Sequence, residues 1–206
     1  MINDVENPTE NLHLVEFNQL ALERLKTAID EALANGHAFL AMLDDEAGLD
    51  DLDNKAGQAN SQVNDAQLSS QQALNDIIAF DHVNLALDRS WGLLSHLNSV
   101  VSDEPIRALH HALLPALSAY GTAVGQHLPL YQRYQRVVSD ESFFARLEPA
   151  RQRSLTLALQ SFELSGVGLG EAQKQQFATL ASELSTLSAK FSDNVLDATQ
   201  SYFLPL

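Results

Sequence analysis

The sequence predicts an all-α protein, a multi-helix bundle of antiparallel helix pairs with a long C-terminal helix. Apolar residues recur at steps of three and four along most of the chain, which is the spacing of one buried helix face. No segment alternates apolar and polar residues in the manner of a β-strand. Glycine and proline positions separate the periodic segments, as expected between packed helices.

The first part of the chain divides into a helical segment and a polar connector. In residues 1–43 an apolar stripe runs from Leu14 to Leu33, and Asn35-Gly36 predicts a helix stop, although the apolar residues from Phe39 to Leu43 can extend the helix. Residues 44–72 are rich in acidic, amide and serine side chains. We therefore expect a solvated connector there, with at most a turn or two of helix.

Residues 73–206 form the main helical region. Helical periodicity resumes at Leu74 and continues to Leu97. Pro105 suits the first turn of the next helix, because the first N–H groups of a helix have no partner within it. Pro115 should kink or split that helix.

Three more helices are expected in the last third. A short aromatic helix spans residues 128–138, another begins at Glu148-Pro149, and glycines between Gly166 and Gly170 should end it in a tight turn with positive φ angles. The last helix carries an apolar seam with steps of three and four, made of Phe177, Leu180, Leu184, Leu187 and Phe191. This seam covers only about two heptads, which favours packing within a bundle or helix hairpin over a coiled coil.

Composition argues against several classes of function. The net charge of −15 disfavours nucleic acids and anionic membranes, whose partners are rich in Lys and Arg. The absence of cysteine removes disulfides, thiolate nucleophiles and cysteine-based zinc sites. The N-terminus has no basic, apolar signal pattern, and no window approaches the roughly 18 apolar residues of a membrane span. We expect a cytoplasmic protein without nucleic-acid or membrane partners.

No pattern in the chain predicts a catalytic or metal site. The seven histidines never stand three or four residues apart, the spacings at which one helix can present two imidazoles to a metal. The adjacent pair His110-His111 points in directions about 100° apart, which favours structural or surface roles. The acidic run from Asp44 to Asp53 lacks the spacing of a calcium loop. We therefore expect no cofactor bound by this chain.

Several blocks of sequence are similar to one known family. The longest are FELSGVGL at residues 162–169 and FSDNVLDAT at residues 191–199, with SHLNSV at residues 95–100 upstream. The shorter ones are Leu114-Pro115, Val124-Gly125-Gln126-His127, Leu130-Tyr131 and Leu184-Ser185. Together they resemble the thimet oligopeptidase family of zinc metallopeptidases, in its bacterial branch. The resemblance spans roughly Ala73 to Phe203 and is weak before that.

The resemblance implies the N-terminal region of a zinc metalloendopeptidase that hydrolyses short oligopeptides. In such enzymes this helical region forms one wall of a deep channel that admits short peptides and excludes folded proteins. Their zinc-binding HExxH helix lies several hundred residues further on, and this chain contains no HExxH. We therefore expect no catalytic residue and no activity here, with zinc supplied by a missing catalytic domain. The matching blocks make His96, Asn98 and Tyr131 candidates for facing the substrate channel.

Two alternatives remain open at this stage. One is a stand-alone helical module without enzymatic activity that binds peptides or a full-length peptidase and regulates it. The other is a scaffold that self-associates through the apolar seam, which an isolated domain could also do. Residues 202–206 are apolar, whereas natural chain ends are usually polar and frayed. We therefore expect a sequence cut from a longer one, which favours a peptidase fragment.

Overall fold

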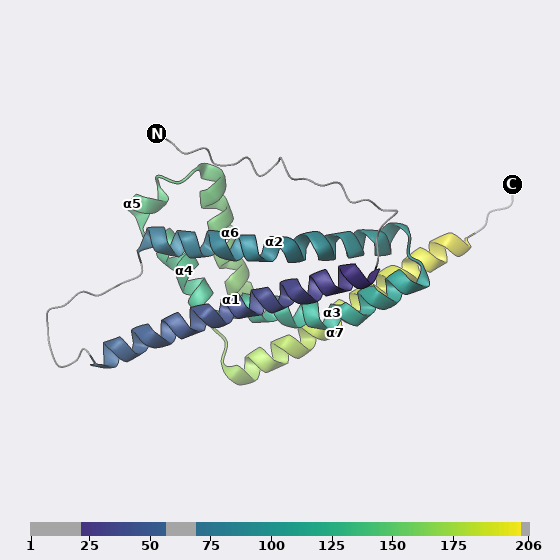
Figure 1. The fold of residues 1–206 in the computed structure, drawn as a ribbon, viewed down its shortest axis with the longest axis horizontal. Helices are drawn as coiled ribbons and strands as arrows, with labels where there is room; N and C mark the ends of the chain where they lie inside the picture. Colours follow the sequence, from purple (N-terminus) through teal and green to yellow (C-terminus); the bar gives the residue numbers. More distant parts are fainter. Residues whose placement is uncertain (1–21, 57–68, 203–206) are drawn as a thin grey trace.

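The computed structural model describes residues 22–56 and 69–202 (Figure 1). Every regular element within these ranges is a helix, which confirms the all-α prediction. The antiparallel pairing of all helices remains a prediction. The helices are α1 (Leu22–Ala56), α2 (Ser70–Val100), α3 (Glu104–Gly125), α4 (Leu128–Ser139), α5 (Glu141–Phe144), α6 (Pro149–Leu164) and α7 (Glu171–Ser201).

The core lies between α1, α2 and α4. The helices α1 and α2 lie side by side, and α4 packs against both (Figure 1). Ile29 and Leu43 on α1 and Leu94 on α2 are fully buried, and so are Leu130 and Val137 on α4. These residues belong to one continuous apolar cluster. The N-terminal helical segment and the main helical region therefore share a single core.

Asn35-Gly36 does not end α1, which continues to Ala56, so the predicted stop is wrong and the alternative extension through Phe39 to Leu43 is confirmed. A Cβ atom at Gly36 would overlap the hydroxyl of Tyr120 on α3, so glycine is needed here for the close approach of two helices. Leu40 and Leu43 lie further along α1 and are buried. Their burial outweighs the roughly 1 kcal/mol that glycine costs inside a helix.

The expectation of at most a turn or two of helix in residues 44–72 is also wrong. α1 extends to Ala56, about three and a half turns past Leu43, and α2 begins at Ser70. Ser69 caps α2, since its hydroxyl accepts a hydrogen bond of 3.0 Å from the backbone N–H of Gln72. Once a helix is nucleated, adding polar residues to it costs little. Residues 57–68, like the predicted stripe before Leu22, lie outside the described residues.

The helix α3 confirms the prediction for Pro105 and excludes one of the two outcomes predicted for Pro115, a split, while a kink stays a prediction. Pro105 lies in its first turn, and Asp103 caps it by accepting a hydrogen bond of 3.0 Å from the N–H of Ile106. Pro115 does not split the helix, which runs unbroken to Gly125. Its side chain is exposed, so water can satisfy the carbonyl that loses an N–H donor.

The remaining helix boundaries agree with those predicted from the sequence. The helices predicted over residues 74–97 and 128–138 are α2 and α4, and Pro149 begins α6. The turn after α6 contains Gly166 with φ of 83°, whereas no other glycine in the described ranges has a positive φ. A left-handed residue at this point lets the chain change direction between α6 and α7.

The helix α7 packs in a way that the sequence did not predict. It rests on α3 (Figure 1), yet four of its five seam side chains are exposed and Phe177 is half-buried. The exposed fractions are 58% for Leu180, 67% for Leu184, 63% for Leu187 and 69% for Phe191. The partly buried side chains on the other face include Ala181, Ser185, Ala189 and Asp193. The prediction that the seam packs within a bundle or hairpin of this chain is therefore wrong.

None of the described helices is both long and apolar enough to span a bilayer.

Candidate functional site

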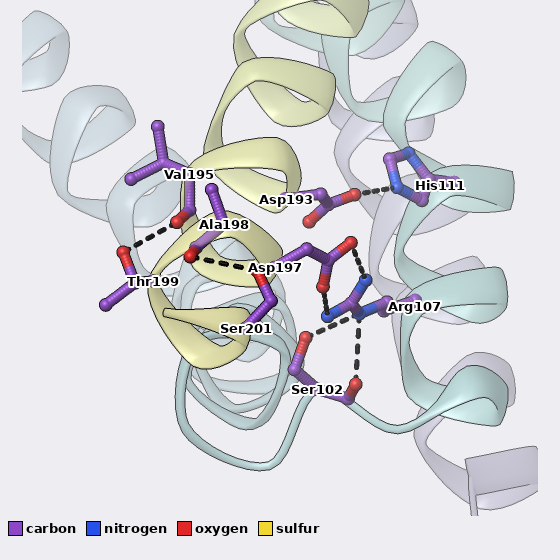
Figure 2. Close-up of polar contacts among 9 residues, drawn as sticks. All are labelled: Ser102, Arg107, His111, Asp193, Val195, Asp197, Ala198, Thr199 and Ser201. Carbon is purple, nitrogen blue, oxygen red and sulfur yellow. Dashed lines mark hydrogen bonds and ion pairs between the residues drawn. The ribbon is translucent and has the colours of Figure 1, made fainter. Parts of the chain in front are cut away.

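A cluster of polar side chains joins α7 to α3 (Figure 2). The guanidinium of Arg107 donates two hydrogen bonds to Asp197, of 2.6 and 3.0 Å. Its Nε also donates to the backbone carbonyl and the hydroxyl of Ser102, at 3.0 and 2.7 Å. Ser102 has a positive φ of 52°, an unusual conformation for serine that these bonds hold in place. Arg107 thus ties the α2–α3 turn to the end of α7.

One turn further along α3, His111 repeats this contact. Its Nε2 lies 2.6 Å from Oδ2 of Asp193 (Figure 2). The neighbouring His110 stacks on Trp91 of α2, with ring centroids 4.7 Å apart. Burial, followed by the proximity of His111, lowers the pKa of His110. The two histidines therefore serve different helix contacts, which confirms the structural role expected for this pair.

This cluster lacks the composition of a hydrolytic centre. A histidine paired with a carboxylate activates a nucleophile only when a hydroxyl or thiol lies within hydrogen-bond reach of the imidazole. Ser102, the serine that the cluster engages, bonds to Arg107 and not to His111. The arrangement can fix the position of α7 through charge-assisted hydrogen bonds, and we assign it that role.

A second contact joins the end of α3 to the turn before α7. Gln126 donates a hydrogen bond of 3.1 Å from its side chain to the carbonyl of Ser165. A Cβ atom on Gly125 would lie 2.6 Å from the Cβ of Ser165, so only glycine allows this approach. Val167 is buried in the same turn. Two of the sequence blocks that carry the family resemblance therefore meet at this point.

His127 completes this junction. Its Nδ1 accepts a hydrogen bond of 3.2 Å from the N–H of Leu130 and so caps α4. Its Nε2 lies 3.1 Å from Oδ1 of Asp44 on α1. Burial lowers the pKa of His127, and the Asp44 carboxylate opposes that shift. Because Nδ1 accepts the hydrogen bond from Leu130, a neutral imidazole carries its proton on Nε2. Nε2 is buried and lies near the Asp44 carboxylate without forming a well-aligned hydrogen bond to it.

Comparison with known proteins assigns the family. A model of the family described as Neurolysin/Thimet oligopeptidase, N-terminal domain, matches residues 49–174, which is more than half of the chain. The chain belongs to this family. Its matched region ends in the first turn of α7, so it includes the junction at His127 and the α3 half of the polar cluster.

Curated relatives agree with this assignment of the thimet oligopeptidase domain. Oligopeptidase A of Haemophilus influenzae is 39% identical over 128 residues, which are 62% of this chain and 19% of the relative. Oligopeptidase A of Escherichia coli is 41% identical over 120 residues, or 58% and 18% of the two chains. The organellar, chloroplastic/mitochondrial oligopeptidase A of Arabidopsis thaliana is 30% identical over 112 residues, or 54% and 14%. The chain spans less than a fifth of the length of these relatives.

The candidates for the substrate channel do not gather at one place in the domain. His96 is exposed near the end of α2, whereas Asn98 is half-buried two residues later on another face. Tyr131 packs edge to face on Phe162 between α4 and α6, with ring centroids 5.9 Å apart. The contact between Asp76 and Arg133 holds α4 beside the first turns of α2, about 30 Å along that helix from His96.

The zinc ion that the oligopeptidase family implies does not fit the described residues. Residues 22–56 and 69–202 contain no group of three or more His, Cys, Asp or Glu side chains placed to hold a metal. A zinc site takes at least three protein ligands, and the pair of His111 and Asp193 offers two.

Sequence reasoning missed the polar cluster. No sequence pattern above assigns a role to Arg107, and both Asp193 and Asp197 belong to the block FSDNVLDAT at residues 191–199. The signal was present, because Arg107 and His111 are four residues apart and so are their partners Asp193 and Asp197. Two helices with opposite charges at matching i, i+4 spacing can pair along one shared edge.

Proposed function

We propose that this chain is the N-terminal, channel-wall domain of a zinc metalloendopeptidase that hydrolyses short oligopeptides. The observation that carries the proposal is the match of residues 49–174 to the N-terminal domain of the neurolysin/thimet oligopeptidase family. The catalytic zinc and its ligands belong to a part of the enzyme outside these 206 residues. The alternative of a stand-alone regulatory module has no comparable support.

The role we propose for the domain is steric. α1 has 35 residues and is therefore about 50 Å long, and α2 lies along it, so the pair forms an extended and stiff surface. Polar contacts attach both α7 and the α6–α7 turn to α3 and the residue that follows it. A wall of this kind selects peptides by size, because a folded protein cannot pass beside it while a short flexible peptide can.

Among the three channel candidates, His96 is best placed to reach a peptide. Its side chain is exposed, whereas Tyr131 is engaged with Phe162 and Asn98 is half-buried. We propose that His96 contacts passing substrate, and that Asn98 and Tyr131 support the wall. We also propose that the enzyme acts in the cytoplasm, which agrees with a chain free of cysteine.

The first experiment tests the chain alone. The purified protein is incubated with a quenched fluorescent short peptide, with added zinc and separately with a chelator. We expect no hydrolysis above buffer under either condition. Hydrolysis that the chelator abolishes would contradict the proposal that the catalytic zinc lies in another part of the enzyme, since it would place a complete metal centre within these residues.

The second experiment tests the steric role. Residues 49–174 replace the aligned region of Escherichia coli oligopeptidase A, and the chimera is assayed on a short peptide and on a folded protein. We expect cleavage of the peptide only. A folded chimera that has lost peptide cleavage, or that cuts the folded protein, would contradict a substrate-restricting wall.

The same chimera tests His96. We expect His96→Ala to raise the KM for the peptide, with little change in kcat, because the residue contacts substrate outside the catalytic centre. His82→Ala is the matched control, since His82 is an exposed histidine on the same helix. Equal KM values for the two variants would contradict the proposal that His96 contacts the substrate.

A further inference from the structure

The side chain of His127 lies where α1, α3 and α4 meet. His127 follows α3 and is the cap residue of α4, and its ring reaches α1, where Nε2 lies 3.1 Å from Oδ1 of Asp44. Only 9% of the His127 side chain is exposed. Leu130, whose N–H the ring caps, is fully buried in the core. The imidazole therefore stands between a helix start and a carboxylate, with little access to water.

The two ring nitrogens have partners with opposite requirements. Nδ1 accepts a hydrogen bond of 3.2 Å from the N–H of Leu130, so it must carry no proton. Among the described residues Nε2 has no well-aligned hydrogen-bond partner, although the Asp44 carboxylate lies beside it. The neutral ring thus keeps the helix cap and gains little from Asp44. The doubly protonated ring gains an ion pair with Asp44 and loses the cap, because a protonated Nδ1 donates and no longer accepts.

We propose that His127 is a proton-operated switch at the start of α4. In the neutral state the ring caps α4, and in the protonated state it releases the N–H of Leu130 and pairs with Asp44 on α1. The released N–H lies next to the core, where an unpaired donor is unfavourable, so the first turn of α4 opens toward water. The positive charge adds to this effect, because it stands at a helix N-terminus, where the helix dipole repels cations.

Burial and the charges of three helices set the pH at which the ring changes state. Burial has the largest effect and lowers the pKa of His127. From α1, the Asp44 carboxylate and the carbonyl of Leu40 favour the protonated ring. From α4, the guanidinium of Arg133 disfavours it, and Asp76 on α2 forms an ion pair with that guanidinium. The capped state therefore persists near neutral pH, and the switch responds to acid below about pH 6.5, the ordinary value for histidine.

The first turn of α4 is connected to contacts further along that helix. Arg133 donates to the carbonyl of Pro129 in this turn, at 3.2 Å, and to Asp76 on α2, at 2.7 Å. Tyr131 packs on Phe162 of α6. Opening of the turn therefore also loosens α4 where it meets α2 and α6. Because all of these contacts lie within the chain, the switch does not depend on the proposed enzymatic function.

Nitrogen NMR of the full chain tests the switch directly. The ring nitrogens of His127 are followed in a long-range proton–nitrogen correlation while the pH is lowered from about 7.5 to about 5. We expect a neutral ring with its proton on Nε2 at the start and a doubly protonated ring at the end. Over the same transition, the amide of Leu130 should lose roughly fivefold in protection from hydrogen exchange, which is the size expected for one helix cap. Protection is taken relative to an unstructured peptide at the same pH.

Two variants separate the switch from other effects of acid. His127→Asn keeps a good helix cap that cannot be protonated, so the protection of Leu130 should stay constant over this pH range. Asp44→Asn removes the carboxylate that favours the charged ring, so both transitions should move to lower pH. Asp45→Asn is the matched control and should shift them much less, because Asp45 is an exposed carboxylate next to Asp44 on the same helix. Far-UV circular dichroism of each variant measures whether the helices are retained.

Several results would overturn the proposal. In the wild-type chain, the neutral ring could carry its proton on Nδ1, which would mean that it does not cap α4. The ring could stay neutral throughout, or become protonated while the Leu130 amide keeps its protection. These results need no variant, so they decide the matter even if a variant does not fold. Equal loss of protection in His127→Asn, or unchanged transitions in Asp44→Asn, would likewise exclude the exchange of the cap for the ion pair.

Discussion

Arg133 on α4 and Asp76 on α2 form an ion pair, with Nε of the arginine 2.7 Å from Oδ2 of the aspartate. The two side chains are 7% and 15% exposed, so both partners are largely removed from water. Arg133 also donates to the carbonyl of Pro129 in the first turn of its own helix. The pair therefore fixes the position of α4 along α2.

Removing one partner of this pair should be costly. We expect Asp76→Ala to lower the free energy of unfolding by about 1.5–3 kcal/mol, because it removes a charge-assisted hydrogen bond between two largely buried side chains. Replacing both residues together, with Asp76→Leu and Arg133→Met, should cost less than the single change. Urea unfolding followed by circular dichroism measures both values. Asp30→Ala, which breaks an exposed pair with Lys26, is the control and should leave the urea midpoint unchanged.

The close approach of α1 to α3 predicts a second effect. Gly36→Ala forces a methyl group onto the hydroxyl of Tyr120, which is 4% exposed and held by a hydrogen bond of 2.6 Å to Asn84. We expect a loss of about 1–3 kcal/mol from overpacking, despite the better helix propensity of alanine. Gly92→Ala on α2 meets open space and should instead stabilise the protein by about 0.5–1 kcal/mol. Equal effects of the two changes in thermal unfolding would contradict the packing at Gly36.

Acid stability should depend on Asp140. The hydroxyl of Ser70, the N–H of Phe143 and the hydroxyl of Ser142 donate to its carboxylate and lower its pKa to about 2. The folded state thus holds the charged form more tightly than the unfolded chain does. The resulting stabilisation is fully present above pH 4 and disappears as the pH falls from 4 toward 2.

Ser70→Ala tests this account. Loss of the strongest donor should move the pKa of Asp140 back toward 3.8, the ordinary value for aspartate. A carboxyl-carbon NMR titration of wild type and variant measures the shift directly. If the two titration curves coincide, the hydroxyl does not hold this carboxylate.

His110 should make the protein sensitive to mild acid. Burial lowers its pKa, so the unfolded chain binds a proton that the folded chain does not. The free energy of unfolding therefore falls as the pH drops through about 6.5, the ordinary value for histidine. His110→Phe can keep the stack on Trp91 but has no proton to bind. We therefore expect its free energy of unfolding to fall less than that of wild type between about pH 7.5 and about pH 5.5. An identical pH dependence would contradict the assignment.

The polar cluster should control local opening of α7. We expect the double variant Arg107→Ala and His111→Ala to speed amide hydrogen exchange in residues 189–201, while exchange in α1 and α2 stays as in wild type. Gln175→Ala, an exposed change near the other end of α7, is the control. Faster exchange throughout the core would mean that the cluster supports the whole fold, not one helix.

The fold was largely predictable from the sequence because local signals agreed with the packing. Pro105 and Pro149 mark helix starts, and the apolar positions from Leu74 to Leu97 follow one buried face. The helix stop at Asn35-Gly36 failed for a tertiary reason. Glycine signals both helix ends and close helix contacts, and only the position of Tyr120 separates these meanings.

The candidate site was less predictable. The contacts of Arg107 and His111 cross more than 80 residues of sequence. The matching spacing of four residues on each helix therefore becomes informative only once α3 and α7 are known to be neighbours. The apolar seam is a periodic signal that identifies α7 as a helix. An apolar periodicity predicts that one face of a helix is apolar, but it does not predict what packs against that face.

The two faces of α7 have separate consequences for protein engineering. Alanine, serine and paired charges attach this helix to α3, so the apolar seam contributes little to the folding of a single chain. Polar replacements along the seam should therefore change solubility and crystallisation behaviour while the fold is retained. Substitutions at Ala181, Ser185 or Ala189 would instead have to fit the narrow space between two helix backbones, and that face should tolerate the least change in size.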